Sequence, residues 1–165
     1  MLFLEDVEIK EWRADHGVGL GDDGFPTLDH ALIYEVRVAY ARGARSGRER
    51  GVAEDCVQIL GSWEECLLWV TQWGIWGSGE DWPTYYAARG RRGERRSLGK
   101  APGHLFESAE TADLAEFLTL VMENAWDAYL LPAYQGAVDR LRILVSHDEL
   151  VEVRSVVPVT FSAAV

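Results

Sequence analysis

Four of the seven tryptophans in the chain lie in the stretch Ser62-Trp63-Glu64-Glu65-Cys66-Leu67-Leu68-Trp69-Val70-Thr71-Gln72-Trp73-Gly74-Ile75-Trp76. Ser62 and Glu65 have the spacing of a capping box, in which each side chain pairs with a backbone N–H at the start of a helix. One face of such a helix would be apolar, with Trp69 beside it: Trp63, Cys66, Leu67, Val70 and Trp73. The pattern therefore predicts an amphipathic helix at the centre of the hydrophobic core, because large aromatic side chains dominate core energetics.

The composition is that of one folded unit. The chain has 165 residues, of which 48% are hydrophobic and 26% charged, and this mixture argues against global disorder. We therefore expect a single globular domain over residues 1–165.

Neither a membrane span nor a secretory signal is visible. No apolar run approaches the ~20 residues that cross a bilayer, and the first residues lack a basic region and a cleavage site. We expect no membrane partner and a cytoplasmic location.

The two cysteines, Cys56 and Cys66, are predicted to be reduced, buried and structural. A catalytic Cys66 is the alternative, but Glu64 and Glu65 beside it would raise the pKa of its thiol. No cofactor is expected.

The net charge of −11 is unevenly distributed along the chain. The stretch from Arg42 to Arg50 carries +3 and the stretch from Arg89 to Lys100 carries +5, which leaves −19 for the remainder. This distribution disfavours binding to nucleic acid or to anionic membranes overall, and it favours a partner with a basic surface.

Alternation of apolar and polar residues predicts three strands in the first part of the chain: Leu2–Trp12, Leu32–Tyr40 and Asp55–Leu60. A helix capped by Thr27 is the alternative for Leu28–Ala41. Basic and glycine-containing residues predict a loop over Gly43–Gly51.

The second part of the chain predicts two helices and several strands. One helix runs from Asp81 to Gly90, and a second is capped by Ser108 or Thr111. The intervening segment, from Arg91 to His104, is predicted to be an exposed connection.

Strand character returns at the end of the chain, at Ala128–Leu131 before Pro132, at Leu141–Val145 and at Leu150–Val153. The tail from Val156 to Val165 has no charge, which favours a packed tail over a loose one, and a second copy is one surface against which it could pack. These elements predict an α+β fold, with a mixed or antiparallel sheet packed against two main helices.

One group of functional side chains, Ser146-His147-Asp148-Glu149, lies at the end of a predicted strand. We expect a polar turn, because adjacent residues of an extended chain point to opposite sides. The alternative is a metal-dependent hydrolase or nuclease that uses His147, Asp148 and Glu149. No metal ligands are assigned.

A second group combines aromatic and basic residues, which are enriched at protein interfaces: Trp82, Tyr85, Tyr86, Arg91, Arg92, Arg95 and Arg96. We predict that these residues bind another protein. The leading hypothesis is an acidic binding module, such as an inhibitor, an adaptor or an immunity-like protein, without catalytic activity. Homodimer formation is a further option. A single-stranded nucleic-acid binder acting through the Arg89 to Lys100 loop is another alternative.

Overall fold

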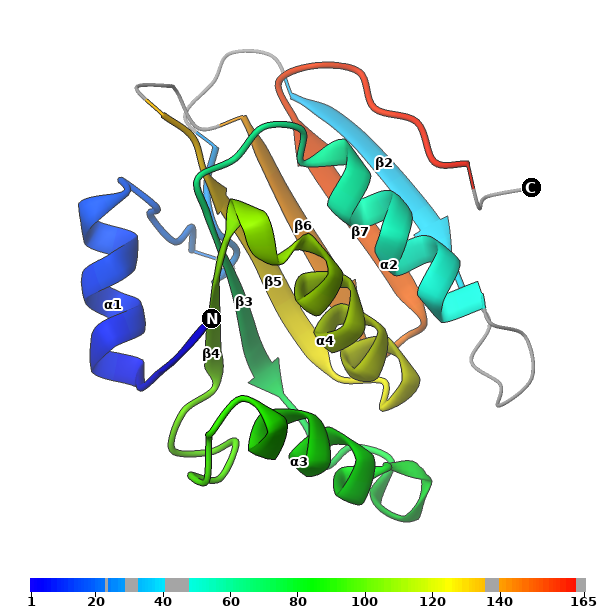
Figure 1. The fold of residues 1–165 in the computed structure, drawn as a ribbon. Helices are drawn as coiled ribbons and strands as arrows, with labels where there is room; N and C mark the ends of the chain where they lie inside the picture. The colour runs from blue at the N-terminus through cyan, green and yellow to red at the C-terminus, as the bar shows by residue number, and fades with distance from the viewer. Residues whose placement is uncertain (23, 29–32, 41–47, 136–139, 163–165) are drawn as a thin grey trace.

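A computed structural model describes residues 1–22, 24–28, 33–40, 48–135 and 140–162. Within them, seven strands form one antiparallel sheet with four α-helices packed against it (Figure 1). The α+β class predicted from the sequence is confirmed, and the sheet is antiparallel throughout.

In chain order the strands are β1 (Leu2–Leu4), β2 (Tyr34–Ala39), β3 (Glu65–Gln72), β4 (Gly103–Glu107), β5 (Asp127–Ala133), β6 (Leu141–Ser146) and β7 (Leu150–Ser155). Their spatial order in the sheet is β1-β4-β3-β5-β6-β7-β2. The helices are α1 (Asp6–Asp15), α2 (Arg48–Ile59), α3 (Trp82–Arg91) and α4 (Thr111–Glu123), with short 3-10 turns η1 (Gly77–Gly79) and η2 (Ser108–Glu110).

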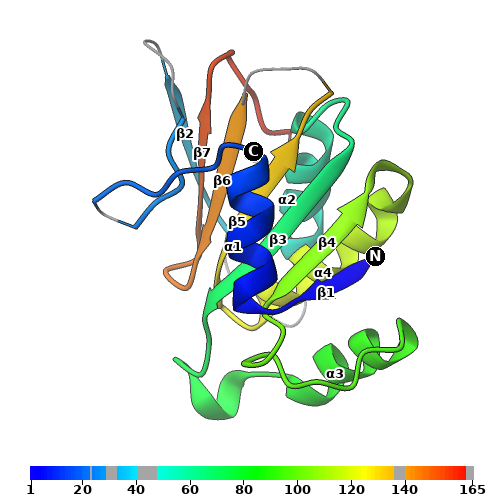
Figure 2. The ribbon, with the colours of Figure 1, turned by 90° about the vertical axis from the view of Figure 1, so that its left-hand side faces the viewer.

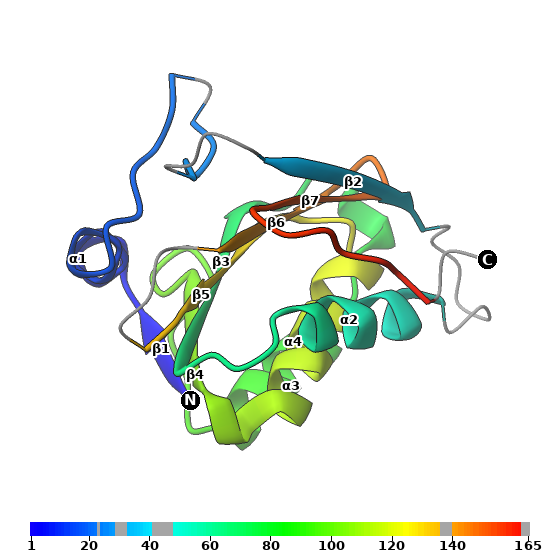
Figure 3. The ribbon, with the colours of Figure 1, turned by 90° about the horizontal axis from the view of Figure 1, so that it is seen from above.

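Helices cover both faces of the sheet unequally. The two main helices, α2 and α4, lie over one face, and α1 lies on the opposite face (Figure 3). The larger core lies under α2 and α4, whereas α1 seals a smaller one that includes Ile9, Trp12, Leu67 and Leu131. Helix α3 lies at one end of the sheet, beside α4 (Figure 2).

The tryptophan-rich stretch is a strand, so the predicted helix is wrong. Its central part, β3, pairs with β4 on one side and β5 on the other. Cys66 and Leu68 enter the larger core while Leu67 enters the smaller one, so apolar residues are needed on both faces. A continuous apolar run of this kind fits a helical stripe and a doubly buried strand equally well.

The N-terminal strand predicted over Leu2–Trp12 is also largely wrong. Only β1 is extended, and α1 follows because Glu5 and Glu8 form a reciprocal capping box. Ile9 and Trp12, three residues apart, then face the sheet.

The strand predicted over Asp55–Leu60 is instead the end of α2. Val52, Ala53, Cys56 and Val57 are buried at helical spacing under this helix. Helix α2 already begins at Arg48, within the loop predicted over Gly43–Gly51, of which residues 43–47 lie outside the described part.

Other elements agree with the sequence predictions. Strand β2 is confirmed in place of the alternative helix over Leu28–Ala41, although residues 29–32 and 41 are outside the described part. Helices α3 and α4 and the β6–β7 hairpin are confirmed, but β5 continues through Pro132. In the tail, Val159 and Phe161 pack against the larger core, and residues 163–165 are not described.

Candidate functional site

Helix α3 positions the aromatic members of the predicted interface. The Asp81 side chain caps the helix by accepting the Thr84 amide N–H at 3.1 Å. The Trp82 ring packs against Trp126, at 4.7 Å between centroids, and stacks on Tyr86 at 5.7 Å. Trp82 is therefore partly buried, whereas Tyr86 keeps an exposed edge.

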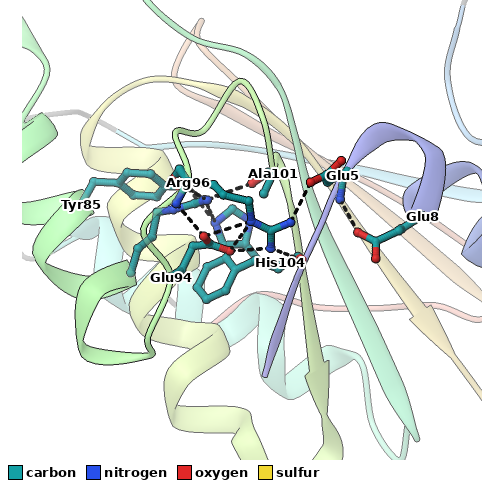
Figure 4. Close-up of polar contacts among 9 residues, drawn as sticks. Glu5, Glu8, Tyr85, Glu94, Arg96, Ala101 and His104 are labelled. Carbon is teal, nitrogen blue, oxygen red and sulfur yellow. Dashed lines mark hydrogen bonds and ion pairs between the residues drawn. The ribbon is translucent and has the colours of Figure 1, made fainter.

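The third aromatic residue, Tyr85, belongs to a buried polar network with Arg89 and His104. Figure 4 shows Tyr85 and His104 in this region. Its hydroxyl donates to His104 Nε2 at 2.7 Å and accepts from Arg89 at 3.1 Å. His104 Nδ1 then donates to the Leu68 carbonyl at 3.3 Å. All three side chains are buried, so in this structure Tyr85 contacts the protein interior and not solvent.

The buried Arg89 guanidinium binds backbone carbonyls through its two terminal nitrogens, whereas its Nε has no hydrogen-bond partner in the described structure. Its guanidinium donates to the carbonyl of Ala101 through both terminal nitrogens, at 3.1 Å each, and to the carbonyl of Arg96 at 3.3 Å. It also lies 4.6 Å from the centre of the Phe3 ring. Arg89 thereby fixes the segment after α3 against the helix, so this segment is not the wholly exposed connection predicted from the sequence.

The same network keeps His104 neutral. Burial, and then the adjacent charge of Arg89, lower the pKa of His104 from 6.5 to about 3. A neutral imidazole can accept a hydrogen bond from the Tyr85 hydroxyl at Nε2 while its Nδ1–H donates to the Leu68 carbonyl.

We expect the free energy of unfolding to fall as the pH is lowered from 6.5 toward about 3. In this window the unfolded chain protonates His104 and the folded chain does not, so protons favour the unfolded state. At about pH 5 the loss from this one residue should be about 2 kcal/mol. Urea unfolding at several pH values would measure this loss. The dependence of the free energy of unfolding on pH should be weaker in His104→Asn than in the wild type. An unchanged dependence on pH would contradict the prediction.

The basic residues after Arg89 form ion pairs with the protein's own carboxylates. Arg91 pairs with Glu116, and Arg92 pairs with Asp113, so both join the end of α3 to α4. These two pairs are partly exposed and contribute little to stability.

Arg96 makes the most extensive contacts of this group. It binds Glu94 at 2.6 Å and Glu5 at 3.0 Å (Figure 4). It also donates to the Phe3 carbonyl at 2.9 Å. Hydrogen bonds from Arg96 lower the pKa of Glu94 to about 2. The segment is thereby also joined to the N-terminus of the chain.

Arg95 is exposed, and no ion pair to it is found within the described ranges. The structure thus brings the seven predicted interface residues into one region, but it uses most of their polar atoms internally. A role of the exposed members in partner binding stays a prediction.

The Ser146 to Glu149 segment forms the turn between β6 and β7. His147 Nδ1 lies 2.9 Å from Asp127 Oδ1, and its Nε2 lies 3.6 Å from Asp148. The backbone N–H of His147 donates to the same Asp127 oxygen. Asp127 could not be connected with this turn from the sequence, because it comes from the neighbouring strand β5. In the part of the chain that is described, no three His, Cys, Asp or Glu side chains are grouped so that they could hold a metal ion.

An open groove of about 1010 Å³ is lined by residues of α2 and α4, which pack against each other. Its lining combines apolar, small and neutral polar side chains with three carboxylates and one arginine: Val57, Gln58, Gly61, Thr111, Ala112, Ala115, Thr119, Leu120, Glu54, Glu116, Glu123 and Arg50. Glu54 pairs with Arg50, and Glu116 pairs with Arg91. This groove was not predicted from the sequence, because the end of α2 was predicted to be a strand.

Both cysteines are buried and reduced, as predicted. Burial raises the pKa of each thiol well above its ordinary value, which disfavours the reactive thiolate form. The alternative of a catalytic Cys66 therefore has no geometric support.

Comparisons with known proteins identify no relatives. The chain matches no family model, no curated protein and no solved structure. Among the described helices, none has the length and apolar character that a membrane crossing requires.

Proposed function

We propose that the protein is a non-catalytic binding module that holds a basic segment of a partner protein in the groove between α2 and α4. The observation that carries this proposal is an open groove with an apolar floor and three glutamates, of which Glu54 and Glu116 pair with arginines and Glu123 makes no ion pair with the described residues. Charge complementarity of this kind speeds association and selects partners more than it adds raw affinity.

Glu123 is the carboxylate that most favours a cationic partner. No ion pair or hydrogen bond to its side chain is found within the described ranges. Burial, followed by the nearby charges of Glu49 and Asp81, raises its pKa. A lysine or arginine of the partner would offset this crowding of like charges.

The floor of the groove favours a segment with an apolar side as well as cations. Val57 and Leu120 lie at its base, 8% and 6% exposed, and Ala112 and Ala115 leave room for a close approach. An amphipathic helix laid in a groove is a common mode of peptide recognition.

The charges of the chain make nucleic acid a less favourable ligand than a basic protein segment. Arg91, Arg92 and Arg96 are each paired with carboxylates of the chain, so a phosphate would have to compete with those partners. The overall charge of −11 adds long-range repulsion.

A designed amphipathic peptide of lysine and leucine tests the proposed groove. We expect binding that weakens steeply as salt rises, and that weakens by about threefold to tenfold in the double variant Glu54→Gln and Glu123→Gln. Fluorescence anisotropy of the labelled peptide would measure the dissociation constant.

The control is Glu11→Gln, which removes an exposed charge from α1, on the opposite face of the sheet. An equal effect of the control on peptide affinity would mean nonspecific attraction and would contradict the groove. Micromolar binding of a single-stranded oligonucleotide, lost when Arg91, Arg92, Arg95 and Arg96 become alanine, would instead support the nucleic-acid alternative.

A further inference from the structure

Strand β2 is the last strand at one side of the sheet. It pairs with β7 along its full length, and no other described strand lies beyond it (Figure 1). An edge strand of six residues presents a row of backbone groups to which another strand can pair.

The hydrogen-bond register shows which backbone groups are available. The Tyr40 N–H donates to the Glu149 carbonyl, at the position that continues the β2–β7 register. Since hydrogen-bonded pairs alternate in an antiparallel ladder, residues 34, 36 and 38 also bond to β7. The N–H and carbonyl groups of Glu35, Arg37 and Ala39 therefore point away from the sheet.

The side chains of this edge carry charges of both signs on one face. Arg37 pairs with Glu152 at 2.9 Å, and Glu35 lies 3.5 Å from Arg154. These contacts hold Glu35 and Arg37 on the sheet face opposite to α2, while Val36 packs toward the larger core.

The sequence of β2 is complementary to itself in one antiparallel register. With Val36 opposite Val36 of a second copy, each Glu35 lies opposite an Arg37 and forms a hydrogen-bonded pair with it. A shift by two residues in either direction places Glu35 opposite Glu35, or Arg37 opposite Arg37, and like charges directly opposite each other are destabilising.

Apolar side chains at the start of the strand add to this complementarity. Ile33 and Tyr34 are 37% and 38% exposed. In the register centred on Val36, Tyr34 lies opposite Val38 of the second copy and Ile33 lies opposite Ala39. Pairing would therefore bury apolar surface at both ends of the β2–β2 strand pair.

We infer that β2 is a self-association edge, through which two copies pair antiparallel about a two-fold axis at Val36 to form one continuous sheet. This inference does not rest on the proposed function, since the edge is separate from the groove between α2 and α4. The two can fail independently.

A proline at position 39 tests the backbone part of the inference. Ala39→Pro removes an N–H that points outward, so the β2–β7 ladder stays intact. We expect the wild-type chain to dimerise and this variant to weaken dimerisation by about tenfold or more, measured by sedimentation velocity over a concentration series. The control Ala39→Val keeps the N–H and should still dimerise.

A charge exchange tests the register. Glu35→Arg and Arg37→Glu should each abolish the homodimer, whereas an equimolar mixture of the two variants should restore a dimer, because opposite charges then face each other at both positions. Thermal unfolding checks that each variant folds. If a charge variant does not fold, the Ala39→Pro variant still tests the inference, because it disturbs no ion pair. A monomeric wild-type chain at every concentration, or a dimer indifferent to Ala39→Pro and to the exchange, would overturn the inference.

Discussion

Replacement of Arg89 by alanine is expected to lower the free energy of unfolding by about 3–5 kcal/mol. The side chain is fully buried, so its truncation leaves a cavity between α3, β1 and the segment that follows α3. The truncation also removes the donors to the Ala101 and Arg96 carbonyls, to Tyr85 and to His104. Buried acceptors that lose a charged donor carry a full desolvation cost.

Two further variants separate these causes. Arg89→Met keeps most of the volume and removes the donors, so its expected loss is about 1.5–3 kcal/mol. Arg95→Ala removes an exposed arginine from the same segment and should change stability by about 0.5 kcal/mol or less. Urea unfolding measures all three proteins. A loss in Arg89→Ala no larger than that in Arg95→Ala would show that the network does not hold the segment in place.

The part of this network on α3 could have been predicted from the sequence. Tyr85 and Arg89 are four residues apart in a segment that was correctly predicted to be a helix, so they share one face. His104 could not have been added, because it reaches them only through the pairing of β4 with β3. The sequence predicts that the segment from Arg91 to His104 is exposed, because basic residues dominate its first part. The segment is instead anchored through the carbonyls of Arg96 and Ala101, which composition does not reveal.

The fold shows the same division between local and non-local information. The β6–β7 hairpin and α4 were predictable, because their apolar residues repeat at the spacing of a strand and of a helix. Strand β3 lies between two other strands and is buried on both faces, so its sequence lacks the alternation that marks an exposed strand. The capping-box residue Glu65 instead accepts a hydrogen bond from the Trp12 indole at 2.9 Å, a contact between elements far apart in the chain.

The strand assignment of β3 leads to a prediction about which tryptophan stabilises the protein most. Trp126 is fully buried, with Trp82 and Tyr85 at 4.7 and 4.8 Å between ring centroids. We expect Trp126→Ala to lower the free energy of unfolding by about 3–5 kcal/mol. Trp69 lies on the opposite face of the sheet, only partly buried, beside Tyr129 at 5.8 Å and under Arg13.

Trp69→Ala should therefore cost about 1–2 kcal/mol, clearly less than Trp126→Ala. Trp126→Phe is a useful companion, since it keeps an aromatic ring and removes an indole N–H for which the described structure offers no acceptor. Its loss should fall well below that of Trp126→Ala because less volume is removed. Urea unfolding of the three variants would rank them. An equal or larger loss in Trp69→Ala would place that ring in the main core, as the helix predicted from the sequence requires, and would contradict the alternating faces of β3.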